Sequence, residues 1–316
     1  MPRPFRFGVQ AATLPSEGWA ERVRRIEALG YSTLFCPDHF SPQWDPTVLI
    51  AGAAAVTTRL RVGTLVYGVD YRHPAVYAKQ AATLHLLSSG RHEFGIGAGW
   101  MESDYRQAGM RYDRPGTRIA RLEEALRIVR GMWAEDGFSF TGRHYRVERV
   151  PRAAELPAGA SPPILIGGGG PRLLAVAGRH ADIVGINPTL PEGRVTPETP
   201  ADLAPERVRQ KVAWVREAAR AAGRDPAAIE LQSLVFVVAI TDRPGGLREA
   251  LASRSGMSVE QVADCPLFLT GPASEIRERL ERRREETGIS YVVIQGGELE
   301  TLERFAAEVV QPLGVR

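Results

Sequence analysis

Short apolar runs alternate with amphipathic segments along the whole chain. The apolar runs are rich in β-branched residues, which is typical of strands buried on both faces of a parallel sheet. The segments between them repeat apolar residues at helical spacing, and several begin at proline or end at glycine. The pattern predicts eight strands, each followed by a helix. The predicted strands span residues 5–10, 32–36, 61–66, 92–97, 164–166, 182–186, 231–240 and 291–295, and the predicted helices span 17–29, 47–56, 74–87, 117–133, 171–178, 205–222 and 273–287, with a last helix through Phe305 and Val309.

Eight such units that close on themselves form a (β/α)8 TIM barrel, and 316 residues suffice for one barrel with insertions. We therefore expect a single domain over residues 1–316. The main alternative is a doubly wound open sheet, which usually has a GxGxxG turn after its first strand, and none occurs there. Three stretches fall outside the repeat and are predicted insertions, at about 137–163, 189–204 and 246–264. The first two are expected to be long loops over the barrel mouth.

Charge and composition argue against several classes of function. The net charge is only +3, and the basic residues are interspersed with acidic ones, which does not favour nucleic-acid binding. Lys79 and Lys211 are the only lysines among 40 basic residues, which we interpret as codon bias in a GC-rich genome. The two cysteines, Cys36 and Cys265, lie far apart in the sequence, so we expect no disulfide framework. We expect the protein to function in a reducing compartment.

No apolar run reaches the roughly 18 residues of a membrane span, and no cleavable leader precedes the first strand. We therefore expect a soluble cytoplasmic protein.

The functional site of such a barrel is built at the carboxyl ends of the strands. The most specific motif at these ends is the run of four glycines at residues 167–170, followed by Pro171. Glycines before a proline-initiated helix expose backbone N–H groups, and the helix dipole adds a favourable potential for an anion. The motif predicts a phosphate site; the alternative is a flexible strand-to-helix turn.

Asp38 and His39 follow the second predicted strand and are the candidates for acid–base chemistry. A histidine at a barrel mouth can donate a proton or stabilise a developing anion near neutral pH. At the end of the fourth strand, Gly97 and Ala98 are small enough for a planar ring to lie against the backbone, although a bulge would explain them equally.

Three aromatic residues near the strand ends, Trp44, Tyr67 and Trp100, are candidates for the wall of a substrate pocket around a ring system. Ordinary packing is the alternative for each of them.

Taken together, these segments resemble the luciferase-like monooxygenase superfamily, and within it the coenzyme F420-dependent reductases and dehydrogenases. The resemblance covers nearly the whole chain in the family's order. The matching segments are Asp38-His39-Phe40, residues 59–64, Pro74 at the start of the third helix, residues 84–91, residues 95–100 and residues 163–170.

The resemblance implies coenzyme F420 as the cofactor, with FMN as the alternative. It places Asp38 and His39 near the redox ring, with His39 as the proton donor or anion stabiliser, and a non-proline cis peptide between Leu65 and Val66 behind the ring. It also assigns Gly169, Gly170 and Asn187 to the cofactor phosphate. The full set of predicted cofactor-binding residues is Asp38, His39, Leu65, Val66, Gly68, Gly97, Ala98, Ser103, Gly168, Gly169, Gly170 and Asn187.

One position departs from the family's pattern. Where a sugar-phosphate dehydrogenase of this family has a catalytic glutamate, this chain has Trp100, and Glu102 is shifted by two residues. The departure argues against sugar-phosphate oxidation and favours another substrate.

A deazaflavin carries hydride and reacts poorly with oxygen, so it suits two-electron chemistry. We predict reduction of a C=C or C=N bond in a small organic molecule, by an enzyme that is a homodimer. The alternatives are an FMN-dependent monooxygenase that uses reduced flavin and oxygen, and a non-catalytic protein that binds a flavin or deazaflavin. A metal-dependent hydrolase would need histidines and carboxylates on several strand ends, and we predict no metal site because the sequence offers only Asp38 and His39.

Overall fold

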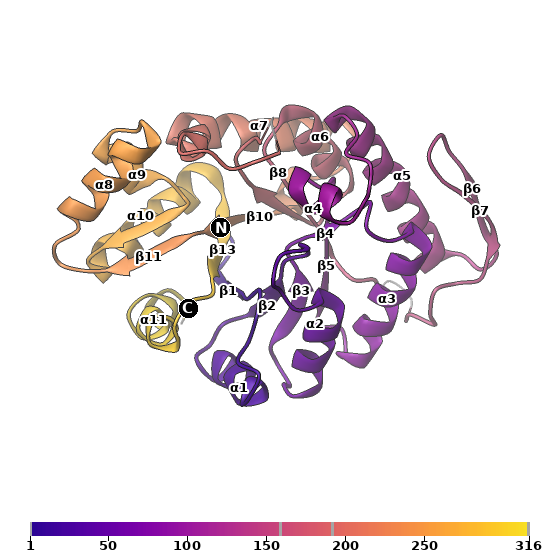
Figure 1. Ribbon diagram of the computed structural model, residues 1–316, viewed down its shortest axis with the longest axis horizontal. Helices are drawn as coiled ribbons and strands as arrows, with labels where there is room; N and C mark the ends of the chain where they lie inside the picture. The colour runs from indigo at the N-terminus through magenta and orange to yellow at the C-terminus, as the bar shows by residue number, and fades with distance from the viewer. Residues whose placement is uncertain (1, 158–159, 191–192, 315–316) are drawn as a thin grey trace.

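Eight parallel strands close into a barrel in the computed structural model, which describes residues 2–157, 160–190 and 193–314. Each strand pairs in parallel with its two neighbours, and pairing between β3 and β5 closes the ring. The predicted (β/α)8 fold is confirmed, with helices around the strands (Figure 1). In order around the barrel, the strands are β1 (Arg6–Gln10), β2 (Thr33–Cys36), β3 (Arg61–Thr64), β5 (His92–Gly97), β8 (Ile164–Gly168), β9 (Ile183–Ile186), β10 (Glu230–Val235) and β13 (Ile289–Gln295).

The surrounding helices follow the predicted positions closely because their ends are encoded locally. Proline opens α2, α3, α5, α6 and α7, where its missing N–H costs nothing. Glycine in the left-handed conformation ends α10 at Gly288, with a φ of 85°. The helices are α1 (Trp19–Ala28), α2 (Pro46–Ala55), α3 (Pro74–Leu87), α4 (Glu102–Gln107), α5 (Pro115–Ala134), α6 (Pro171–His180), α7 (Pro205–Ala221), α10 (Ala273–Thr287), α11 (Leu299–Phe305) and α12 (Gln311–Gly314), with a π-helical turn at Ala306–Val310 and short 3-10 helices at Thr199–Leu203 and Pro226–Ala228. Within the described residues, none of these helices is long and apolar enough to span a bilayer.

A charged network closes the amino end of the barrel. The Glu93 carboxylate is fully buried and accepts hydrogen bonds from Arg6, from Arg61 at 2.6 Å and from the Tyr291 hydroxyl at 3.1 Å. Arg6 also pairs with Glu230 at 2.7 Å. Above this network the interior is filled by the apolar side chains of Phe35, Leu165, Ile183 and Val293. The open end, where a site can form, is therefore the carboxyl end.

The predicted continuous seventh strand, residues 231–240, is wrong. Strand β10 ends at Val235, and β11 (Val237–Ile240) leaves the barrel to pair in parallel with β12 (Phe268–Gly271) in a separate two-stranded sheet. The predicted insertion at 246–264 lies between them as helices α8 (Gly245–Ser255) and α9 (Val259–Asp264), on the left of Figure 1. The sequence is apolar without a break from Leu234 to Ile240, so its pattern gives no sign of the exit.

The predicted insertion at 137–163 forms a hairpin instead of a loop over the mouth; its residues 158–159 lie outside the described part. Strands β6 (Phe138–Thr141) and β7 (Arg146–Val150) pair antiparallel beside α5. The Glu124 carboxylate of α5 accepts the backbone N–H groups of Arg143, His144 and Tyr145 at 2.9 to 3.1 Å. The connection starts at the end of a helix, so it begins at the amino side of the barrel, and only its tip approaches the mouth.

The predicted insertion at 189–204 does lie at the mouth; its residues 191–192 lie outside the described part. The Gly193 carbonyl accepts the Glu102 N–H at 3.3 Å, beside the Tyr112 hydroxyl that donates to the Trp100 carbonyl at 2.8 Å. This loop therefore packs on the segment that follows β5.

Candidate active site

A bulge between β3 and β4 (Tyr67–Gly68) forms the floor of the mouth. The peptide bond between Leu65 and Val66 is cis, as the family resemblance implied, and the Leu65 carbonyl accepts the Gln10 amide at 2.7 Å. A Cβ atom at Gly97 would lie 2.7 Å from a Val66 methyl group, and one at Gly95 would lie 1.8 Å from the Thr64 carbonyl oxygen. Side chains are therefore excluded at both glycines, because the bulge itself packs against their backbone.

Asp38 lies beside this bulge and is 9% exposed. Its Oδ2 accepts a hydrogen bond from Arg72 at 2.9 Å and from the Gly68 N–H at 3.3 Å. Burial raises the pKa of the Asp38 carboxyl above its ordinary value, while Arg72 and the Gly68 N–H oppose that rise. Arg72 also bonds Asp45, the N-cap of α2, at 3.0 Å. Asp38 thus holds a cation and the backbone of β4 together at the mouth.

His39 is held by a carboxylate that the sequence analysis did not single out. The His39 Nδ1 atom lies 2.6 Å from Oδ2 of Asp104, a residue of α4. Asp104 is 1% exposed. Asp104 also accepts the Tyr71 hydroxyl at 3.0 Å and the Phe40 N–H at 3.3 Å. A carboxylate only accepts hydrogen bonds, so Nδ1 carries the proton and Nε2 is left to exchange one. Ser103, a predicted cofactor residue, is the neighbour of Asp104 on α4 and is partly exposed.

The three predicted pocket aromatics lie in different environments. The Trp100 ring meets the His39 ring edge-on, with centroids 5.5 Å apart. Trp44 lies on the connection from β2 to α2 and is 36% exposed. Tyr67 is only 2% exposed, packs against Tyr77 and donates or accepts a hydrogen bond with Thr47 at 2.8 Å. The assignment of Tyr67 to the pocket wall is therefore corrected, because its side chain belongs to the core behind the strands.

The glycine run lies where β8 meets α6, and Asn187 lies next to it at the end of β9. The Asn187 N–H donates to the Gly168 carbonyl at 2.9 Å. A Cβ at Gly169 would lie 2.3 Å from the carbonyl carbon and oxygen of Pro188, so only glycine fits there. Gly170 is the N-cap of α6, a helix of 10 residues. Backbone N–H groups and the positive end of the helix dipole are therefore gathered beside the mouth.

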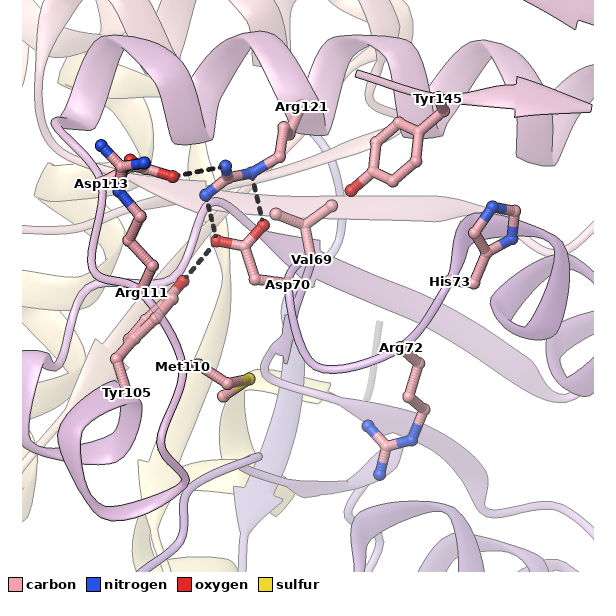
Figure 2. A pocket seen from close by; sticks show the side chains of 10 residues that line it. All are labelled: Val69, Asp70, Arg72, His73, Tyr105, Met110, Arg111, Asp113, Arg121 and Tyr145. Carbon is pink, nitrogen blue, oxygen red and sulfur yellow. Dashed lines mark hydrogen bonds and ion pairs between the residues drawn. The ribbon is translucent and has the colours of Figure 1, made fainter.

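A pocket of about 440 Å³ lies on the outer side of the loop that carries Arg72 (Figure 2). Arg121 of α5 binds Asp70 through two hydrogen bonds, at 2.7 and 2.8 Å, and Asp113 through a third at 2.7 Å. The Tyr105 hydroxyl adds a bond to Asp70 at 2.8 Å. Figure 2 shows Arg72 pointing away from this group. The network anchors the loop and so supports the arginine that binds Asp38.

Comparison with known proteins agrees with the fold. A phthiodiolone/phenolphthiodiolone dimycocerosates ketoreductase of Mycobacterium tuberculosis is 28% identical over 297 residues, which cover 91% of this chain and 70% of the relative. An F420-dependent glucose-6-phosphate dehydrogenase of Amycolatopsis mediterranei is 31% identical over 177 residues, about half of each chain. The structure of an F420-dependent secondary alcohol dehydrogenase in complex with an F420-acetone adduct shares the fold, with a TM-score of 0.77 and 18% identity over 99% of this chain and 100% of that one. A sequence model of the luciferase-like monooxygenases matches residues 6–288, and the chain therefore belongs to the luciferase-like monooxygenase family.

Proposed function

We propose that the chain is an F420-dependent oxidoreductase that transfers a hydride between the deazaflavin and a small organic substrate. The observation that carries the proposal is the pairing of His39 with the buried Asp104 carboxylate at 2.6 Å, at the mouth floored by the bulge of Leu65 and Val66. The F420 dependence named for two relatives supports this choice of cofactor.

The residues of the mouth fit a flat ring with an anionic tail. Gly95 and Gly97 let the bulge of Leu65 and Val66 pack against their backbone, and this bulge is the surface against which a ring can lie. Gly169 and Gly170 would hold the phosphate through backbone N–H groups at the start of α6, with Asn187 beside them. When bound, the deazaflavin supplies or accepts the hydride.

The protein's own part in the reaction is to position the substrate and to move a proton. His39 Nε2 exchanges that proton with the substrate, while Asp104 fixes the ring through Nδ1. Trp100 covers one edge of the His39 ring and restricts its movement and its access to water. Asp38 keeps Arg72 and the β4 backbone in place below.

The bond that is reduced is a polarised double bond. A C=C or C=N bond is the first candidate, and a C=O bond is the second because two relatives are named a ketoreductase and a secondary alcohol dehydrogenase. In each case the atom that gains electron density takes its proton from His39. We propose that the enzyme acts as a homodimer in the cytoplasm.

Titration of the protein with F420 and, separately, with FMN tests the cofactor, with fluorescence quenching as the readout. We expect micromolar or tighter F420 binding and weaker FMN binding. Preference for FMN would move the protein to the oxygen-using monooxygenases, and oxygen consumption would then be the assay.

Turnover separates an enzyme from a carrier. The His39→Ala variant should still bind F420, measured by the same titration, and lose reduction of enone, imine and ketone test substrates. Tight F420 binding by the wild type with no turnover of any of them would favour a non-catalytic deazaflavin-binding protein.

A further inference from the structure

A fully buried lysine lies directly behind the glycine run. The Lys211 ammonium on α7 donates to the Gly169 carbonyl at 2.6 Å, to Asp202 Oδ2 at 2.8 Å and to Thr189 Oγ1 at 3.3 Å, with a side chain that is 0% exposed. An ammonium has three donors, and all three are used. One side chain therefore joins the glycine run, Thr189 in the loop after β9 and the short helix at Thr199–Leu203.

The charge of this lysine is balanced by a shared carboxylate. Asp202 also accepts the Thr189 N–H at 2.7 Å and the Arg207 guanidinium at 2.7 and 2.9 Å. Burial works to raise the pKa of Asp202, but the hydrogen bonds from Lys211, the Thr189 N–H and Arg207 outweigh it and lower the pKa to about 2. Burial lowers the pKa of the Lys211 ammonium, and the hydrogen bond and charge of Asp202 oppose that fall. Two cations thus share one anion behind the glycine run.

The contact with Gly169 fixes the orientation of a peptide plane. In a trans peptide the C=O of one residue and the N–H of the next point in opposite directions. Because the Gly169 carbonyl is bound to Lys211, the Gly170 N–H points away from Lys211. Gly170 is the N-cap of α6, so this N–H lies at the positive end of the helix. Glycine turns move easily between peptide orientations, and the ammonium removes that freedom.

We propose that Lys211 is a positioning residue for anion binding: it locks the Gly169–Gly170 peptide with its N–H toward the cofactor phosphate. The inference rests on the proposed function, because it needs a phosphorylated ligand at the glycine run. The same ammonium binds Thr189, so the loop at the mouth and the phosphate site are held in one arrangement. Arginine cannot replace it, because a planar guanidinium is larger and its fork does not match three converging acceptors in a fully buried space.

Equilibrium binding of two deazaflavins to the Lys211→Met variant tests the proposal. One ligand carries the phospholactyl group without the glutamate tail, and the other is the riboflavin-like deazaflavin without phosphate. We expect Lys211→Met to weaken the phosphorylated ligand roughly 10- to 100-fold, the range for a lost hydrogen bond to a charged group, and to leave the phosphate-free ligand within about twofold. Lys79→Met, at an exposed lysine on α3, is the matched control and should change neither affinity.

Two results would overturn the role of Lys211. One is an equal loss for both ligands, which would indicate general damage to the mouth, and the other is no loss for either. A wild-type protein that binds both ligands equally would instead refute the phosphate site itself. If Lys211→Met does not fold, as judged by circular dichroism, Lys211→Gln replaces it in the test, because the glutamine amide can still donate to Gly169. This variant should lose less affinity for the phosphorylated ligand than Lys211→Met and should also leave the affinity for the phosphate-free ligand unchanged.

Discussion

Replacing Asp104 by asparagine gives the sharpest test of how His39 is held. The substitution keeps the size and one acceptor atom but removes the charge that faces His39 Nδ1 at 2.6 Å. A hydrogen bond to a charged group contributes about 1.5–3 kcal/mol, so we expect kcat to fall roughly 10- to 150-fold. F420 affinity should stay within about twofold, because Asp104 is 1% exposed and is not part of the glycine run that would hold the phosphate.

Steady-state kinetics and a cofactor titration measure these two effects separately. Nitrogen NMR of the imidazole adds a signature that general destabilisation would not produce: the wild type should show the Nδ1–H tautomer of His39, and Asp104→Asn should lose that preference. Tyr71→Phe is the control, since it removes a neutral donor 3.0 Å from the same carboxylate and leaves the histidine contact intact. It should reduce kcat less than about fivefold. An Asp104→Asn variant with wild-type kcat, or one whose loss lies wholly in cofactor affinity, would refute the reasoning.

Three further predictions concern the glycine run, a buried ion pair and a buried histidine. Gly169→Ala would place a Cβ 2.3 Å from the Pro188 carbonyl group, so F420 binding in the same titration should weaken at least about tenfold. Unchanged affinity would contradict the assignment of the phosphate site to the glycine run. Arg72→Met leaves the Asp38 carboxyl, which is 9% exposed, without its cation. The free energy of unfolding, measured by urea titration at pH 7, should fall by about 3 kcal/mol. A loss below about 1 kcal/mol would contradict a stabilising role for this ion pair. Burial lowers the pKa of His92 from 6.5 to about 4, so the native state stays neutral while the unfolded chain takes up a proton. Stability should therefore fall as pH drops from 6.5 toward 4, by up to about 3 kcal/mol, and urea titrations of a His92→Gln variant should show a flatter profile than the wild type.

The barrel could be predicted from sequence because its signals are local. β-Branched runs mark the strands, and prolines and glycines mark the starts and ends of helices; each of these signals acts over a few residues. Because the strand–helix unit occurs eight times, these signals together predict the barrel. The separate sheet of β11 and β12 could not be predicted in this way. From Leu234 to Ile240 the run is apolar throughout, and only the exposure of Phe236 marks the point where the strand leaves the barrel.

The candidate site was predicted in part. The rule that sites lie at the carboxyl ends of strands selected His39 and the glycine run. It missed Asp104, because α4 has only six residues and no helical repeat to distinguish it from a polar loop, and its partner is 65 residues away in sequence. Lys211 was visible as one of two lysines, but nothing along the chain showed that Gly169, 42 residues away, would be its acceptor. Tyr67 was assigned to the pocket because it is aromatic and near a strand end, and the direction of its side chain was not encoded in that position.

The charged closure at the amino end of the barrel has a consequence for the order of events during turnover. Glu93, Arg6 and Tyr291 fill that end and apolar side chains fill the interior, so a ligand can reach the site only through the mouth. Under the proposed function, cofactor and substrate would share this single entrance. If one of them lies beneath the other there, it can leave only after the outer one has gone, and the pair should then bind and depart in a compulsory order.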